Sequence, residues 1–149
     1  MALAGAALVL CLASGCATPS RQAAAPLSPP VAALSCPSGD FRSFLDTYAE
    51  SEPLQRAFTR FPLPVRMLDT AGASEPTPVE RTLDRQQASF PLMPSKLARA
   101  RQGLELRVEE LSERRARVRI AKPDTDFQTV YVFGKEGCWR LERLEDASL

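Results

Sequence analysis

Two consecutive segments between residues 40 and 61 carry the same apolar helical stripe. Their apolar side chains stand at i, i+3, i+4 and i+7, the spacing of one helix face: Phe41, Phe44, Leu45 and Tyr48, then Leu54, Ala57, Phe58 and Phe61. Asp40 or Ser38 can cap the first predicted helix, and Ser51 followed by Pro53 can begin the second. Two short helices cannot shield these aromatic side chains from water by themselves. The rest of the chain must therefore supply a sheet for them to pack on.

The C-terminal half of the chain predicts that sheet, because apolar and polar residues alternate in four of its segments. The alternating segments are residues 104–108, 116–120, 127–133 and 139–142. The third of these is the most apolar, with Phe127, Thr129, Tyr131 and Phe133 expected on one face, so we place it near the centre of the sheet. Two shorter strands are predicted at 65–68 and 79–83, the second at a sheet edge, and a third helix at 95–102. The expected fold class is α+β, with the N-terminal helices packed on a curved antiparallel sheet.

The composition argues against several kinds of chemistry. The 149 residues contain no histidine, which removes Ser-His and Cys-His catalysis and every imidazole metal ligand. Nineteen basic and eighteen acidic residues leave a net charge of +1, which predicts no general attraction to nucleic acid. We therefore expect no metal, no cofactor and no nucleic-acid partner.

The first sixteen residues resemble the export signal of a bacterial lipoprotein. Residues 2–12 form an apolar run that is shorter than the ~20 residues of a membrane span. The run leads to Ser14-Gly15-Cys16, which is similar to a lipobox, so a peptidase is expected to cut before Cys16 and its sulfur to carry diacylglycerol. Ala17, which is not Asp, points to the outer membrane under the sorting rule of Gram-negative bacteria. An ordinary secretory peptide and an uncleaved N-terminal anchor are the alternatives.

The signal and a Pro- and Ala-rich stretch divide the chain into three parts. We expect residues 1–15 to be the signal peptide, 16–35 to be the lipid anchor and its tether, and 36–149 to be a single domain. The lipid would hold this domain in the bacterial cell envelope, at the periplasmic face of the outer membrane. The lipid bilayer, reached through Cys16, is then its first expected partner.

Two cysteines, Cys36 and Cys138, remain once the signal has been removed and Cys16 acylated. In an oxidising envelope two remaining thiols are expected to form one disulfide. Two buried free thiols are the alternative. A zinc site is disfavoured because it would need more sulfur or imidazole ligands than remain, and no histidine is present to activate a catalytic thiol.

Charged residues occupy the polar positions of the alternating segments. They are Arg107, Arg117, Arg119, Arg140 and Arg143, together with Glu105, Glu109 and Glu142. Mixed signs on one face predict cross-strand pairs that keep the face soluble. A binding patch for an anionic ligand is the alternative interpretation.

Several short motifs resemble one bacterial family. They are Asp40-Phe41 with Phe44-Leu45, Leu54-Gln55-Arg56, Phe61-Pro62-Leu63, Lys122-Pro123-Asp124-Thr125-Asp126, and Cys138-Trp139-Arg140-Leu141 followed by Glu145-Asp146. With these motifs, residues 36–149 resemble the bacterial domain of unknown function 4348. The order of the elements resembles the nuclear-transport-factor-2-like (NTF2-like, cystatin-type) fold, a cone in which strands wrap round the N-terminal helices. The resemblance implies a fold but brings no assigned activity.

Enzymes of this broad fold place an Asp, Tyr or His inside the cone to move protons, and the resemblance therefore singles out four residues. These low-ranking cavity candidates are Tyr48, Tyr131, Asp126 and Asp69. Each also has an ordinary interpretation, because the tyrosines lie among core aromatics and the aspartates lie beside turns.

We favour a lipid-anchored envelope protein whose domain binds or scaffolds without catalysis. An envelope protein or a small apolar ligand would be its partner. The alternative is a small-molecule-binding or acid–base enzyme of the isomerase or dehydratase type that uses the cone cavity.

The lipoprotein interpretation predicts that the mature protein from its native host begins at a diacylglyceryl-modified Cys16, which mass spectrometry of the N-terminal peptide checks. A Cys16→Ala variant should leave the membrane fraction, whereas Cys11→Ala, which changes a cysteine inside the apolar run, should not. A mature N-terminus at another residue, or Cys16→Ala protein that stays with membranes, would contradict the prediction.

Overall fold

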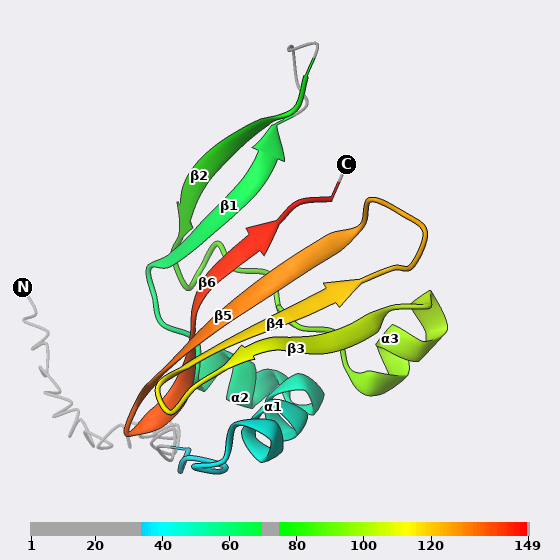
Figure 1. Cartoon of the computed structure of the whole chain (residues 1–149). Helices are drawn as coiled ribbons and strands as arrows, with labels where there is room; N and C mark the ends of the chain where they lie inside the picture. Colours follow the sequence, from blue (N-terminus) through cyan, green and yellow to red (C-terminus); the bar gives the residue numbers. More distant parts are fainter. Residues whose placement is uncertain (1–33, 70–74, 149) are drawn as a thin grey trace, which may run out of the picture. The chain divides into compact units, whose positions relative to one another are not determined.

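The computed structural model describes residues 34–69 and 75–148 (Figure 1). Its elements follow in the order α1 (Phe41–Glu50), α2 (Glu52–Ala57), β1 (Leu63–Asp69), β2 (Thr77–Leu83), α3 (Lys96–Gln102), β3 (Glu105–Leu111), β4 (Arg115–Ala121), β5 (Gln128–Glu136) and β6 (Cys138–Asp146). The expected signal peptide, Cys16 and all but the end of the tether lie outside the described residues. Within the described ranges, none of the helices has the length and apolar character needed to cross a membrane.

The two N-terminal helices begin at the predicted caps. The Asp40 carboxylate accepts a hydrogen bond from the Ser43 backbone N–H at 2.9 Å, and this bond lowers the pKa of Asp40 below its usual value. The Ser51 hydroxyl accepts a hydrogen bond from the Leu54 N–H at 3.4 Å at the start of α2. The whole first stripe is buried, as expected: Phe41, Phe44, Leu45 and Tyr48.

The second helix is shorter than its stripe predicts, because it ends at Ala57 and not at Phe61. The backbone beyond it pairs with the last strand of the sheet. The Leu141 N–H donates to the Phe58 carbonyl oxygen at 2.8 Å, and the Arg60 N–H donates to the Leu141 carbonyl oxygen at 2.8 Å. These long-range bonds replace the next helical turn. The spacing of apolar residues therefore predicted an α2 that is about one turn too long at its C-terminal end.

The six strands of the described residues form one sheet in the order β2-β1-β6-β5-β4-β3 (Figure 1). The strands predicted at 65–68 and 79–83 are β1 and β2, and β2 lies at an edge as expected. Four of the five pairings are antiparallel, but β1 runs parallel to β6. The four C-terminal strands are antiparallel as expected, and the sheet as a whole is mixed because of this one parallel pair. The direction follows from the chain after α2, since Thr59 already bridges Leu141 in parallel before β1 begins.

The hydrophobic core lies between α1, α2 and one face of the sheet, which confirms the α+β architecture (Figure 1). Its centre is Phe133 on β5, an interior strand as predicted. The Phe133 ring centroid lies 5.4 Å from that of Phe41 and 5.4 Å from that of Tyr48, both edge-on. The inner face of β5 is therefore filled near the β5–β6 turn.

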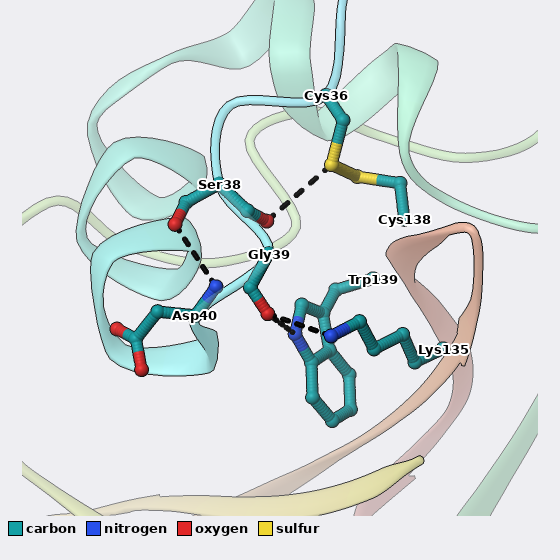
Figure 2. Close-up of a disulfide and its surroundings, with 7 residues drawn as sticks. All are labelled: Cys36, Ser38, Gly39, Asp40, Lys135, Cys138 and Trp139. Atoms are coloured by element: carbon teal, nitrogen blue, oxygen red, sulfur yellow. Dashed lines mark hydrogen bonds between the residues drawn. A yellow bond between two sulfur atoms is a disulfide. The ribbon is translucent and has the colours of Figure 1, made fainter. Parts of the chain in front are cut away.

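A disulfide joins Cys36, just before α1, to Cys138, the first residue of β6 (Figure 2). The two Cα atoms lie 5.7 Å apart, and the predicted pairing is confirmed in the structure. Next to it, the Gly39 carbonyl oxygen accepts hydrogen bonds from Trp139 Nε1 at 3.1 Å and Lys135 Nζ at 2.8 Å (Figure 2). The start of α1 is thus fastened to the β5–β6 hairpin by one covalent bond and two hydrogen bonds.

The 102-residue separation of the bridged cysteines predicts a large effect of reduction on stability. Closing a loop of this length is worth up to about 4.7 kcal/mol in the chain-entropy model, because it restricts the unfolded chain. Trp139, the chain's one tryptophan, is buried, so its fluorescence during thermal unfolding measures the effect directly. Dithiothreitol should lower the Tm of the original protein strongly.

The matched control is the double variant Cys36→Ser/Cys138→Ser, whose Tm should be low with or without the reductant. An equal Tm for the oxidised and the reduced original protein would contradict the proposed role of the bridge. So would peptide mapping without reductant that finds the two cysteines unlinked.

Candidate functional site

A pocket of about 500 Å³ lies on the inner side of the sheet, near α3. Its first wall is the sheet, with Ile120 on β4 and Thr129 and Tyr131 on β5. Its second wall is the junction of α1 and α2, and its third is formed by the segment 91–95 and α3. The pocket thus occupies the part of the β5 inner face that the N-terminal helices leave uncovered.

Tyr131 is the predicted candidate that the structure places in this pocket. Its hydroxyl donates a hydrogen bond to the Leu92 carbonyl oxygen at 2.9 Å. Burial raises the pKa of Tyr131 above its ordinary value, so the phenol stays protonated at neutral pH. The hydroxyl therefore holds the third wall in place, and its proton is engaged in this hydrogen bond.

Gln55, which sequence reasoning did not single out as a site residue, fastens the same wall. Its side chain is 0% exposed. Nε2 donates to the Met93 carbonyl oxygen at 2.9 Å, and Oε1 accepts from the Met93 N–H at 2.9 Å. Gln55 and Met93 are 38 residues apart in the chain, so no local spacing in the sequence could have identified this contact.

Tyr48 lies in the core and does not line the pocket. It is 0% exposed, and its hydroxyl lies 2.9 Å from Thr59 Oγ1. Because the Thr59 hydroxyl donates to the Gln55 carbonyl oxygen at 2.6 Å, Tyr48 is the donor in the first bond. Burial raises the pKa of Tyr48 as well. This chain of bonds gives Tyr48 the core role that was its ordinary interpretation.

The two aspartate candidates lie away from the pocket lining. Asp126 is exposed in the turn between β4 and β5 and lies beside a shallower hollow with Leu104 and Phe127. Asp69 is the last residue of β1, opposite Thr77 of β2. The structure therefore brings neither carboxylate to Tyr131.

Phe127 precedes β5 and belongs to the pocket lining, although it is 39% exposed. Phe127 was expected on the same strand face as Tyr131. In the structure it lies at the pocket rim, one residue before β5 begins. The exposed ring therefore adds an apolar surface to the pocket opening.

Two acidic side chains complete the lining, Glu50 at the end of α1 and Glu52 at the start of α2. Glu50 Oε1 accepts a hydrogen bond from the Lys96 backbone N–H at 2.6 Å, which links α1 to the first residue of α3. Glu52 Oε1 lies 2.7 Å from Arg56 Nη2 in an ion pair one helical turn long. Within residues 34–69 and 75–148, no group of three or more acidic or cysteine side chains is arranged to hold a metal ion.

The outer face of the sheet carries ion pairs between strands. Arg117 Nη2 lies 2.9 Å from Glu145 Oε2, and this hydrogen bond raises the pKa of Arg117. Arg119 Nε lies 2.6 Å from Glu109 Oε1. These cations already have anionic partners across the strands, which favours the interpretation of a solvated face over an anionic-ligand patch.

A comparison with solved structures supports the fold. No protein-family model and no curated protein matches the chain. A crystal structure of an NTF2-like protein from Bacteroides fragilis is similar, with a TM-score of 0.55 and 21% sequence identity. The match covers 74% of this chain and 47% of that one, so this chain corresponds to about half of that protein's length. The likeness establishes the fold alone: an α+β domain of the NTF2-like type.

Proposed function

We propose that residues 36–149 form a non-catalytic binding domain, which takes a small ligand with a large apolar part into the pocket beside Tyr131. The observation that carries this proposal is the pocket itself. Its volume of about 500 Å³ lies within the roughly 300–1,000 Å³ that small-molecule sites occupy. The aromatic core beneath the helices is filled, and the pocket lies beside it; three of its lining residues, Gln102, Leu104 and Phe127, also line a shallower hollow.

The lining supports an apolar ligand. Leu92, Leu104 and Ile120 are aliphatic lining residues, and Tyr131 is an aromatic one. Nearly half of the lining residues carry polar side chains, which can orient a ligand by hydrogen bonds while the apolar residues supply contact: Glu50, Glu52, Gln55, Ser95, Gln102, Thr129 and Tyr131.

The hydrogen bonding supports binding over proton transfer. An acid–base enzyme needs a group that exchanges its proton near neutral pH. The Tyr131 hydroxyl donates to Leu92 and has a raised pKa, and neither Asp69 nor Asp126 lines the pocket. An isomerase- or dehydratase-type enzyme remains the alternative, and turnover of a small carbonyl or hydroxy compound that is lost in Tyr131→Phe would establish it.

The cellular setting belongs to the same proposal. A lipid on Cys16 would hold the domain at the periplasmic face of the outer membrane, through the tether that ends near Cys36. The disulfide supports export to an oxidising compartment. Membership of the domain of unknown function 4348 family and a scaffolding contact with another envelope protein are further parts of this proposal.

A Gln55→Met variant tests whether the third wall is preformed by buried hydrogen bonds. The change keeps the length of the side chain but leaves the Met93 N–H and carbonyl groups without their partners. The cost of such unsatisfied groups is roughly 1–3 kcal/mol of unfolding free energy. Denaturant unfolding measures the loss, and hydrogen exchange should speed up at residues 91–96.

Gln86→Met is the control for this variant, because Gln86 is an exposed glutamine outside the pocket. It should leave both stability and exchange unchanged. Equal stability of Gln55→Met and Gln86→Met would show that the wall does not depend on Gln55.

An Ala98→Trp variant tests the pocket as a binding site. Ala98 lines the pocket from α3, so an indole at this position should fill much of the space. Binding of the neutral naphthalene dye prodan, followed by its fluorescence, should weaken at least about tenfold, which corresponds to about 1.4 kcal/mol. The protein is the full chain with Cys16→Ser, so that no acyl chain competes for the dye.

Ala100→Trp is the matched control, because Ala100 is an exposed residue of the same helix and does not line the pocket. It should bind prodan as the original protein does. Equal affinity in both tryptophan variants, or no dye binding by the original protein, would contradict the proposed function.

A further inference from the structure

The charged side chains that line the pocket are all acidic. Glu50 and Glu52 are lining residues, whereas none of the lining residues within the described ranges is a lysine or an arginine. Arg99 of α3 is a nearby cation, but its Nη1 donates to the Pro94 carbonyl oxygen at 2.7 Å and the residue does not belong to the lining. The charged residues of the lining itself are therefore acidic, while Arg101 and Lys122 lie in the adjoining hollow that shares Gln102, Leu104 and Phe127 with the pocket.

The two carboxylates differ in how far their charge is neutralised. Glu52 forms an ion pair with Arg56. Glu50 accepts a hydrogen bond from the backbone N–H of Lys96, a neutral donor, and no lysine or arginine side chain of the described part of the chain forms an ion pair with it. Glu50 is thus the lining carboxylate that forms no ion pair within the described residues; it is exposed, and the bond to α3 fixes its position.

A second polar group on the wall has no partner. Thr129 lies on the same face of β5 as Tyr131 and is only 9% exposed. Among residues 34–69 and 75–148, nothing forms a hydrogen bond with its hydroxyl. The hydroxyl oxygen keeps some contact with solvent, so water can occupy the place of a partner when no ligand is bound. A polar atom of a bound ligand would supply this partner.

We propose that the pocket selects a small organic amine, whose apolar body packs against Leu104, Ile120 and Tyr131 and whose ammonium group lies beside Glu50. Thr129 would accept or donate a hydrogen bond to a polar atom of the same molecule. An ammonium is attracted by the exposed carboxylate of Glu50, whereas a carboxylate or phosphate is repelled by it and finds no cationic side chain among the lining residues. The inference rests on the proposed binding function and names the chemical class of the ligand.

Three probes of equal shape test the charge preference: 3-phenylpropylamine, 3-phenylpropan-1-ol and 3-phenylpropionate. The full chain with Cys16→Ser is titrated with each at pH 7 and low salt, and chemical shifts or heats give the Kd values. The amine should bind at least about fivefold more tightly than the carboxylate, with the alcohol between them, and added salt should narrow the difference.

Glu50→Gln isolates the charge, since the amide oxygen can still accept the bond from the Lys96 N–H. In this variant the amine should bind as weakly as the alcohol, while the Tm stays the same. Glu113→Gln, which removes an exposed carboxylate outside the pocket, controls for net charge and should keep the amine preference.

The outcomes separate this inference from the proposed function. Binding of the alcohol or the carboxylate as tight as that of the amine, an amine preference that survives Glu50→Gln, or prodan binding without amine binding each overturns the amine assignment. Failure of prodan and of all three probes to bind overturns the binding function itself.

Discussion

The packing of α1 on Phe133 is the contact on which the rest of the structure depends. Phe133 lies on an interior strand, and the rings of Phe41, Phe44 and Tyr48 surround it from one helix. Such large buried rings supply much of the apolar area that leaves water on folding. The disulfide and the bonds to Gly39 hold the start of this helix to the β5–β6 hairpin (Figure 2). The helices are therefore placed over one half of the sheet.

The other half of the inner face is covered differently, and the pocket is the result. Beyond Phe133, β5 presents Tyr131 and Thr129, and here the cover is the segment 91–95 followed by α3. None of the α3 residues is buried, so apolar packing contributes little to holding this helix in place. The cover is fastened by polar bonds, from Tyr131 to Leu92 and from Gln55 to Met93. Loose apolar packing together with firm polar attachment leaves a space that stays open to a ligand.

The side chains of the pocket wall are better suited to binding a ligand than to catalysis. Buried side chains near the pocket, Gln55 and Tyr131, use their polar atoms to position backbone, so they are structural supports of the site. The polar groups left for a ligand include the carboxylate of Glu50, the hydroxyl of Thr129 and the amide of Gln102. A fixed charge and neutral hydrogen-bonding groups orient a ligand, but they do not form an acid–base pair. The NTF2-like fold hosts several kinds of function, so the argument rests on these residues and not on the fold.

The sequence alone determined the local elements and the disulfide. The caps at Asp40 and Ser51, the buried stripe of α1, the strand periodicity of β5 and the pairing of Cys36 with Cys138 were all predicted correctly. Each of these follows from spacing within one element or from a count of the available thiols.

Tertiary structure alone decided the parallel pairing of β1 with β6, the early end of α2, the placing of Tyr131 at the pocket and the role of Gln55. The physical reason is that these features come from bonds between residues far apart in the chain. The Leu141 backbone forms hydrogen bonds with Phe58 and Arg60 in place of the next helical turn. The backbone of Met93 supplies the hydrogen bonds that allow Gln55 of α2 to be buried. The period of a helix or a strand reports which face of an element is apolar, but it carries no information about which distant backbone group will meet that face.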